Sequence, residues 1–410
     1  MLNNQNEREL CYAVRVTDIT PIEGADKVEL AHINGWHIMV KKGDYKVGDL
    51  AIYFEIDSLL PMTNPAFDFM AKYKYKVKTQ RFIKGKILSQ GLLMRPDELG
   101  LKNVKEGDFL TKELGVTYYE AEDNVRKASS KDLMETKVAK RMGVWKKRHK
   151  FLSRFKFICE LRRNLFEKQI KGVQKKKKTS WPYWVKKTDE DRCQNLPQLF
   201  REPLNEIHWI PTEKIDGTST TFTMRQAKKR KRRAIICSRN VVFDTPQANE
   251  KNYYKDTDGN VYVEMFEKYD INVVLNHILD KHPEYEFITI QSETYGGTIQ
   301  KRKYCNEHRL AIFNIIFKTK GLEPIRLNPI EMCDFVDQIN KELQTENKLE
   351  CVPIICEDFV LPTTCEMLLE YADGASEIDG EMREGLVFRS RDGKLSFKAV
   401  SNKFLEKYHG

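Results

Sequence analysis

The first 120 residues of the chain alternate short apolar runs with turn residues. Apolar runs occupy residues 12–16, 28–33, 36–40 and 50–56, and glycine, proline and acidic residues lie between them. Many short runs at even spacing are typical of a barrel of β-strands. We therefore predict a small β domain over residues 1–120.

A helical pattern replaces this one between residues 121 and 187. Five apolar residues recur there at the spacing of one helix face, with Lys and Arg between them: Phe151, Phe155, Ile158, Leu161 and Leu165. Four consecutive lysines, residues 175–178, follow. The pattern predicts a basic helical linker or insert over residues 121–187.

The remainder, residues 188–410, has the pattern of one domain of helices and mostly antiparallel strands. Residues 220–223 and 234–237 predict the two arms of a hairpin, with the basic cluster 228–233 at its turn. That cluster resembles a nuclear-localisation signal, but we interpret it as a charged hairpin tip. Further strands are expected at residues 287–291, 310–317, 386–388 and 395–400. The expected fold class of the chain is α+β.

Three helices are expected in the same domain. One covers about residues 262–280. A second begins at Asn328, because Pro329 suits the first helical turn and Glu331 stands at the capping-box position. A third, short helix begins at Thr363 and ends at Gly374.

The net charge of +10 is concentrated in one segment. Residues 137–178 contain 17 Lys or Arg and two Glu, a local charge of +15, so the rest of the chain sums to −5. Three interpretations stay open: a helical linker packed on a neighbouring domain, a site for RNA phosphates, or a membrane-surface helix. The candidate phosphate contacts are Lys146, Lys147, Arg148 and Lys150.

Composition excludes several classes of protein. The polar first ten residues predict no signal peptide, and no apolar run approaches the roughly 20 residues that span a bilayer. The nine cysteines are scattered, with no CxxC pair, which favours reduced thiols over a zinc site or disulfides. We expect an intracellular protein, with cytoplasm and nucleus not distinguished.

Chemically informative residues in the 188–410 domain form an ordered series. The first member is Lys214-Ile215-Asp216-Gly217, a Lys-x-Asp-Gly run. The later members are Arg239, Glu293, Phe313, Glu384 and Lys398. Lys-x-Asp-Gly alone occurs often by chance and would be a solvated turn, but a whole series in order is much harder to obtain by chance.

The series resembles that of the covalent nucleotidyltransferases, which include DNA ligases, RNA ligases and mRNA capping enzymes. The resemblance implies that Lys214 is the nucleophile, that Lys398 contacts the α-phosphate of ATP and that Phe313 stacks on adenine. For Phe313, the alternative is an ordinary core residue of a buried strand. Glu213, Arg192 and Arg239 are further candidates for nucleotide binding.

The attacking amine must be neutral, although a free lysine has a pKa of about 10.4. A neighbouring cation and a divalent metal would lower that pKa, and Lys398 supplies the cation. Carboxylates suit Mg²⁺ or Mn²⁺, which we expect to be held largely through water. The candidate ligands are Asp216, Glu293 and Glu384, and Glu293 could alternatively bind the ribose hydroxyls.

Domain order indicates the branch of the superfamily. Only 12 residues follow Lys398, too few for the C-terminal OB barrel of DNA ligases and capping enzymes. Residues 46–54, 87–93, 188–196 and 401–405 instead resemble an RNA ligase family typified by the Naegleria and Deinococcus enzymes. The resemblance implies an N-terminal OB domain before the ligase domain, ATP as cofactor, and RNA with 3′-OH and 5′-phosphate ends as substrate. We expect a monomer.

The chain departs from the family pattern at two positions. Many superfamily members have a Lys-x-Lys pair in the last motif, but Ser396 stands two residues before Lys398. The missing cation is expected from Lys394, if from any residue. Ser292 stands where a glycine is usual.

Two rival functions stay open. One is a GTP-dependent, capping-type nucleotidyltransferase. The other is a non-catalytic, OB-containing RNA-binding protein with a degenerate ligase domain, and the presence of Lys214, Glu293, Glu384 and Lys398 argues against it.

Overall fold

The computed structural model describes six ranges and several single residues of the chain. The ranges are 8–82, 87–119, 156–174, 181–227, 232–243 and 260–408, and the single residues are Val138, Met142, Trp145, Lys146, His149 and Leu152. The chain forms two compact units, one of Met1–Tyr118 with Trp181–Gly410 and one of Tyr119–Ser180. None of the helices in the described ranges is long and apolar enough to cross a membrane.

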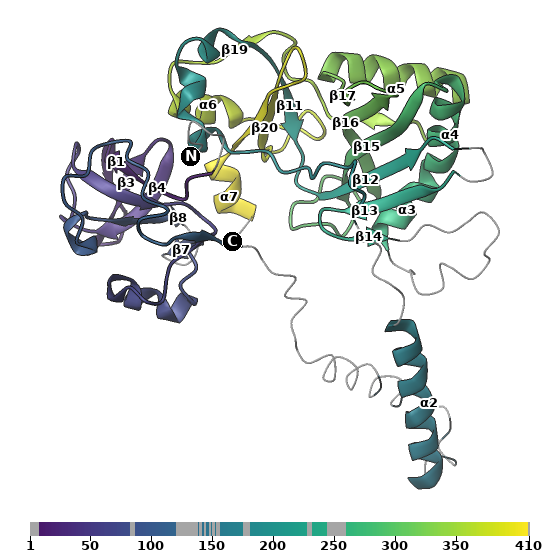
Figure 1. Ribbon diagram of the computed structural model, residues 1–410, viewed down its shortest axis with the longest axis horizontal. Helices are drawn as coiled ribbons and strands as arrows, with labels where there is room; N and C mark the ends of the chain where they lie inside the picture. Colours follow the sequence, from purple (N-terminus) through teal and green to yellow (C-terminus); the bar gives the residue numbers. More distant parts are fainter. Residues whose placement is uncertain are drawn as a thin grey trace. The chain divides into compact units, whose positions relative to one another are not determined.

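The described part of the N-terminal domain contains ten short strands, five of which, β1, β3, β4, β7 and β8, are labelled in Figure 1. One sheet has the order β1 (Cys11–Arg15), β5 (Leu50–Phe54), β9 (Leu92–Met94), and another has the order β2 (Asp18–Pro21), β3 (Val28–Ile33), β4 (Trp36–Lys41). Two pairs complete the set: β7 (Thr79–Phe82) with β8 (Ile87–Gln90), and β6 (Ser58–Leu59) with β10 (Thr117–Tyr118). The 3₁₀ helices η1 (Pro65–Tyr73) and η2 (Asp97–Leu99) lie between strands.

The core of this domain lies on both sides of the β1–β5 pair. Cys11 and Phe54 face one apolar cluster, whereas Tyr12 and Tyr53 face the other. Successive side chains of a strand point to opposite faces, so a strand buried on both faces is apolar throughout. The predicted barrel-forming strands are therefore confirmed.

The larger sheet of the C-terminal domain has seven strands. Its main path runs β14 (Val242–Phe243), β13 (Ala234–Ser238), β12 (Thr218–Arg225), β15 (Tyr285–Gly296), β16 (His308–Thr319), β17 (Ile325–Arg326). These neighbours are antiparallel, and β18 (Glu350–Cys351) pairs with β16 in parallel. The predicted hairpin is the β12–β13 pair.

Helices α3, α4 and α5 share one apolar core with this sheet (Figure 1). Helix α5 (Pro329–Leu343) confirms the predicted start, because the Asn328 side chain accepts from the Glu331 backbone N–H while the Glu331 side chain accepts from that of Asn328. The single helix predicted over 262–280 is wrong. The chain forms α3 (Val261–Lys268) and α4 (Ile271–Lys281), which are separated by Asp270 in the left-handed conformation.

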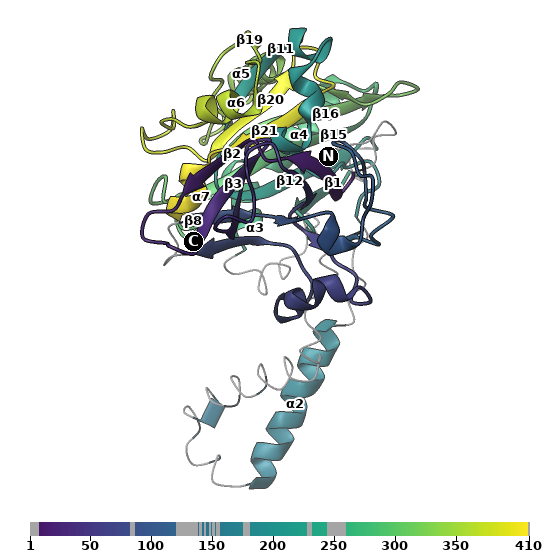
Figure 2. The ribbon, with the colours of Figure 1, turned by 90° about the vertical axis from the view of Figure 1, so that its left-hand side faces the viewer.

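The smaller sheet has the order β19 (Phe359–Val360), β11 (His208–Lys214), β20 (Gly385–Ser390), β21 (Ser396–Val400). Figure 2 shows β20 beside β21, its antiparallel partner. One face of this sheet packs with α6 (Cys365–Ala372), the predicted short helix, in a separate apolar core. Helix α7 (Asn402–Tyr408) ends the described chain, and the 3₁₀ helices η4 (Cys193–Asn195), η5 (Pro197–Phe200) and η6 (Leu204–Glu206) precede β11.

The basic segment forms a helix, α2 (Lys156–Gln174). Two residues of its predicted apolar face, Leu161 and Leu165, are exposed, and Phe151 and Phe155 lie outside the described residues. Of the candidate phosphate contacts, Lys146 is exposed, and Lys147, Arg148 and Lys150 lie outside the described residues.

The basic cluster of the β12–β13 hairpin is not wholly a solvated tip. Residues 228–231 lie outside the described residues, but the Arg232 side chain is only 6% exposed. Its guanidinium donates to Gln226 Oε1 at 2.6 and 2.9 Å and to Asp280 Oδ1 on α4 at 2.7 Å. Arg232 therefore ties the hairpin to the helix that covers the sheet.

We predict that Arg232→Ala lowers the free energy of unfolding by about 1–3 kcal/mol, because it removes charged hydrogen bonds from a nearly buried position. Arg233→Ala, which removes the neighbouring exposed arginine, is the matched control and should cost less than about 1 kcal/mol. Chemical denaturation of both variants measures the difference. Equal losses would show that Arg232 is a surface charge, as the sequence suggested.

Candidate active site

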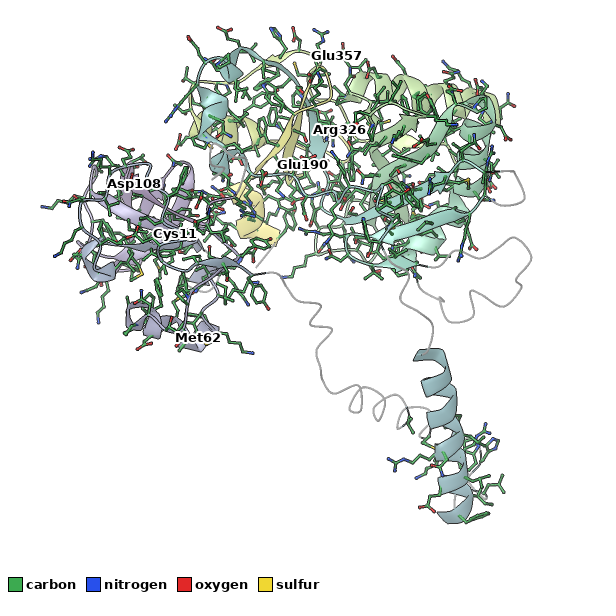
Figure 3. All side chains as sticks on the ribbon, viewed as in Figure 1. Cys11, Met62, Asp108, Glu190, Arg326 and Glu357 are labelled. Carbon is green, nitrogen blue, oxygen red and sulfur yellow. The ribbon has the colours of Figure 1, made fainter. Side chains whose placement is uncertain are left out.

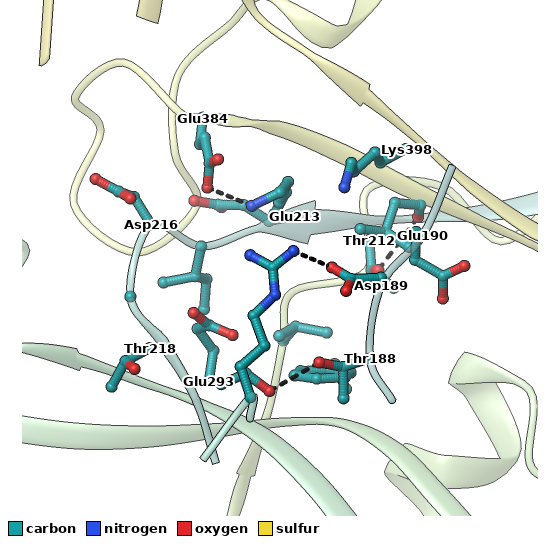
Figure 4. A pocket seen from close by; sticks show the side chains of 18 of the residues that line it. Thr188, Asp189, Glu190, Thr212, Glu213, Asp216, Thr218, Glu293, Glu384 and Lys398 are labelled. Atoms are coloured by element: carbon teal, nitrogen blue, oxygen red, sulfur yellow. Dashed lines mark hydrogen bonds and ion pairs between the residues drawn. The ribbon is translucent and has the colours of Figure 1, made fainter. Parts of the chain in front are cut away.

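The two sheets of the C-terminal domain enclose a pocket of about 380 Å³, a size typical of small-ligand sites (Figure 4). The smaller sheet contributes Lys214, Val387 and Lys398, and the larger sheet contributes Glu293 and Phe313. Arg239, Asp216 and Glu384 line the same pocket. The pocket thus brings together the whole series predicted from sequence.

Pairing of β11 with β20 places the candidate nucleophile against a carboxylate. Lys214 is opposite Gly385 in the register, so Glu384, which directly precedes β20, lies beside it. The Lys214 Nζ donates to Glu384 Oε2 at 2.6 Å, across 170 residues of sequence (Figure 4). The same close pairing explains Gly385, since a Cβ there would stand 2.2 Å from the Ala399 carbonyl oxygen.

Gly217, the glycine of the Lys-x-Asp-Gly run, is required because a larger side chain does not fit there. A Cβ on Gly217 would lie 2.3 Å from the Thr294 carbonyl oxygen and 2.8 Å from Cγ of Glu293. The backbone N–H of Asp216 donates to the Tyr304 hydroxyl at 2.9 Å, which fixes the turn. The turn therefore connects Lys214 to β12 and lies in close contact with β15, the strand that contains Glu293.

The charge balance around Lys214 favours its protonated form. Burial alone would lower the pKa of Lys214, but the carboxylates of Glu384, Glu293 and Asp216 together raise it above its usual value. These carboxylates therefore favour the ammonium form of Lys214, which cannot attack a phosphorus atom.

Glu293 is the carboxyl most affected by its surroundings. Burial raises the pKa of Glu293 to about 8, although Lys214 lowers it and Glu384 and Asp216 raise it further. A carboxyl of this kind becomes ionised at neutral pH only when a cation joins it.

The predicted metal ligands do not form a ready-made cage. Within the described ranges, no three His, Cys, Asp or Glu side chains gather closely enough to hold a metal ion. Direct coordination by Asp216, Glu293 and Glu384 together therefore finds no support, and contact through water stays a prediction.

Lys398 lies on β21 opposite Val387 and faces the pocket. Burial lowers the pKa of Lys398 to about 8, and the charges of Lys214 and Arg192 add to this effect. Lys398 is still mostly charged at pH 7, as a phosphate contact requires.

Arg192 does not line the pocket, although its backbone pairs with that of Lys398. Its guanidinium lies 5.6 Å from the ring of Trp36 in the N-terminal domain. The structure places Arg192 behind Lys398, where it connects that strand to the OB domain. Nucleotide binding by Arg192 stays a prediction.

Glu213 lines the pocket, and its carboxylate is also bound within the protein. Its carboxylate accepts from the Ser376 hydroxyl at 2.5 Å and from the Glu377 backbone N–H at 2.8 Å. It therefore anchors the loop that leads to Glu384, and nucleotide binding by Glu213 stays a prediction.

Phe313 and Arg239 line the pocket as expected. Phe313 lies on β16 and is partly buried against the core, so one part of its ring packs inside while the pocket reaches another. Arg239 is bound by Asp189, and Thr188 bonds with Ser219 at 2.9 Å (Figure 4).

Lys394 does not replace the missing lysine of the last motif. Its side chain is 81% exposed and lies 3.5 Å from Asp392, away from the pocket. The hydroxyl of Ser396 instead donates to Glu190 and accepts from Arg326.

Sequence reasoning missed Glu190 and Arg389, both of which line the pocket. The only available signal was that Glu190 falls in the family-like stretch 188–196.

Comparison with known proteins agrees with this arrangement. Residues 10–96 match the family model of an OB-fold domain, and residues 207–405 match the family model named RNA ligase. No curated protein sequence matches the chain at a significant level.

Solved structures of a Naegleria gruberi RNA ligase are similar over almost the whole chain. A mutant of that enzyme with AMP and Mn is 27% identical, with a TM-score of 0.63, over 98% of this chain and 99% of that one. A second mutant, with ATP and Mn, is 26% identical with a TM-score of 0.62 over 98% and 100% of the two chains. The chain belongs to the RNA ligases in which an OB-fold domain precedes the RNA ligase domain.

Proposed function

We propose that this RNA ligase joins a 3′-OH to a 5′-phosphate RNA end through AMP carried on Lys214. Lys214 Nζ attacks the α-phosphorus of ATP and pyrophosphate leaves. The AMP passes to the RNA 5′-phosphate, and the RNA 3′-OH then attacks that phosphate and releases AMP. Each step is a phosphoryl-type transfer that depends on positioning and on charge neutralisation.

The observation that carries the proposal is the placement of one lysine among three carboxylates in a nucleotide-sized pocket. Lys214 bonds to Glu384, and Glu293 and Asp216 are near enough to raise its pKa. Because this cluster attracts cations, ATP with a divalent metal fits it better than ATP alone.

The relatives' structures support both ligands, since they contain ATP or AMP together with Mn. Glu293, Glu384 and Asp216 offer only oxygen donors, the kind that Mg²⁺ and Mn²⁺ prefer. A bound divalent metal would neutralise these carboxylates and lower the pKa of Lys214, and the same oxygens would hold the metal through its waters.

Lys398 is suited to the phosphate rather than to the attack. It lies across the sheet from Lys214 without a carboxylate bonded to it in the described structure, and a phosphate beside it would raise its lowered pKa. Arg239 also lines the pocket, and its guanidinium is paired with Asp189. On nucleotide binding it would leave Asp189 and bind a phosphate or a ribose hydroxyl.

The OB domain would act with the ligase domain in the first step. The guanidinium of Arg192 lies over Trp36, and Arg81 of β7 donates to backbone carbonyls of Leu405 and Glu406 at the end of α7. Both contacts connect this domain to strand β21 or to the helix that follows it.

Replacement of Lys214 should abolish transfer of AMP to the protein. Lys214→Ala removes the reacting amine, and Lys214→Arg keeps a positive charge that cannot lose its proton at working pH. Incubation with α-³²P-ATP and a divalent metal, with α-³²P-GTP in parallel, measures labelling. Labelling of either variant at the rate of the unaltered protein would remove the basis of the proposal, and labelling by GTP alone would favour a capping-type enzyme.

Glu293→Gln should remove a pH dependence of stability. The folded carboxyl titrates at about 8 and an unfolded glutamate at about 4.3, so the folded protein holds an extra proton between these values. Its free energy of unfolding therefore falls as pH rises through this window.

The Gln variant should consequently be the more stable protein at pH 8.5 in buffer with EDTA, by more than about 1 kcal/mol. Mn²⁺ should raise the melting temperature of the unaltered protein more than that of the variant. Glu267→Gln, which alters an exposed carboxylate of α3, is the control and should leave both properties unchanged. A Glu293→Gln variant that is less stable than the unaltered protein at every pH would contradict this account.

The segment 137–178 should bind RNA phosphates. Changing Lys146, Lys147, Arg148 and Lys150 to Gln should weaken RNA binding and make the slope of log affinity against log salt shallower by about 0.7 per lost contact. AMP labelling should stay nearly constant because ATP binds elsewhere. The control variant changes four exposed lysines of the ligase domain, Lys320, Lys341, Lys348 and Lys394. Equal slopes in the two variants would assign the basic segment a structural role.

A further inference from the structure

Arg389 is a buried cation of the nucleotide pocket that the proposed reaction does not use. It lies on β20, two residues after Val387, so both side chains leave the same face of the smaller sheet. This face lines the pocket, and the Arg389 side chain is only 2% exposed. Burial lowers its pKa to about 10, which still leaves it charged at neutral pH.

The hydrogen bonding of Arg389 differs from that of Arg302 and Arg383, two other buried arginines of the domain. Arg302 is held by both oxygens of Asp379 at 2.7 and 2.9 Å, and Arg383 donates to the backbone carbonyls of Tyr371 and Ala372. Among the described residues, Nε and Nη1 of Arg389 have no hydrogen-bond acceptor although both atoms are buried. Unsatisfied donors on a buried charge are costly, and they require an explanation.

The carboxylate of Glu190 lies beside this guanidinium, and one of its oxygens can still accept a hydrogen bond. Glu190 Oε1 lies 3.9 Å from Arg389 Nη2 and 3.8 Å from Arg326 Nη1, beyond hydrogen-bonding distance in both cases. Its other oxygen, Oε2, accepts from Ser396 at 2.6 Å. Figure 3 labels Glu190 and Arg326, which lie near each other in the ligase domain. Donors without acceptors and a carboxylate oxygen thus share one end of the pocket.

That end is the one where a base would lie. Lys214, whose amine would meet the α-phosphate, lies toward the other end, because it pairs with Gly385, whereas Arg389 pairs with Ile210 four residues further along β20. The Arg389 guanidinium lies 6.0 Å from the ring centre of Phe313, the aromatic residue of the facing sheet. A planar base stacked on Phe313 would therefore turn one edge toward Arg389 and Glu190.

We infer that Arg389 and Glu190 together recognise the edge of the adenine of ATP. Arg389 donates to a ring nitrogen, N1 or N7, and Glu190 Oε1 accepts from the 6-amino group, which adjoins both nitrogens. Adenine presents this donor next to an acceptor, so one base satisfies both side chains. Ser396 takes part indirectly because its hydroxyl orients Glu190. The inference rests on the proposed adenylylation of Lys214.

The test compares ATP with analogues in the AMP-labelling assay, with Arg389→Met and Arg389→Lys as variants. With the unaltered protein, 1-deaza-ATP or 7-deaza-ATP, whichever lacks the contacted nitrogen, should reduce kcat/KM by about 5- to 150-fold relative to ATP. In Arg389→Met this ratio should fall to about one, because the donor has gone. Arg389→Lys should retain part of it. Purine riboside triphosphate lacks the 6-amino group. The loss of kcat/KM with this analogue relative to ATP therefore measures the contact with Glu190.

Arg232→Met is the matched control, since it removes another nearly buried arginine whose donors are satisfied inside the protein. It should lower the melting temperature and leave the ratio between ATP and its analogues unchanged.

Three results would overturn the inference. An unchanged ratio in both Arg389 variants would show that Arg389 is only a buried partner of Glu190. An equal loss with every nucleotide would place Arg389 on a phosphate, and an equal penalty in the control would trace the effect to stability. Failure of the unaltered protein to label itself would instead refute the proposed function, so the two failures can be told apart.

Discussion

The antiparallel pairing of β11 with β20 is the constraint on which the rest of the site depends. It sets Lys214 opposite Gly385, and this register holds Glu384 at 2.6 Å from the lysine amine. The next pairing, β20 with β21, sets Lys398 across from Val387 on the same face. A shift of one residue in either register would turn these side chains into the apolar core around α6. Backbone hydrogen bonds between distant segments therefore fix the chemistry.

The resulting site is electrostatically unfavourable without its ligands. The carboxylates of Glu384 and Asp216 and the carboxyl of Glu293, whose pKa burial raises to about 8, surround Lys214 and raise its pKa. Such an arrangement costs stability in the free protein and is relieved when cations and phosphates bind. Arg389 extends the pattern further along β20, where its buried Nε and Nη1 have no acceptor among the described residues.

Much of this site could be predicted from sequence because its residues are chemically distinctive and keep a fixed order. Lys214, Glu293, Phe313, Glu384 and Lys398 all line the one pocket. The capped start of α5 was also predictable, since Asn328, Pro329 and Glu331 act locally. The break between α3 and α4 was not, because the apolar spacing continues through Asp270 and only the backbone conformation changes.

Long-range contacts account for the other differences. Nothing near Arg232 in the sequence shows that Asp280 will bind it, and nothing near Glu213 shows that Ser376 will. Lys394 was chosen for its proximity in sequence to Ser396, but its side chain is exposed. Arg326 reaches Ser396 from 70 residues away, an arrangement that only the folded chain reveals.

The central claim is that Lys214 carries the AMP, and the pocket contains a lysine that competes for this role. Lys398 has the lower pKa of the two, because burial and the neighbouring cations outweigh the carboxylate of Asp189. Peptide mass spectrometry after incubation with ATP and Mn²⁺ locates the adduct directly. The account predicts one AMP on the peptide that contains Lys214 and none on the peptide that contains Lys398. AMP on Lys398, or an unmodified protein under these conditions, would contradict it.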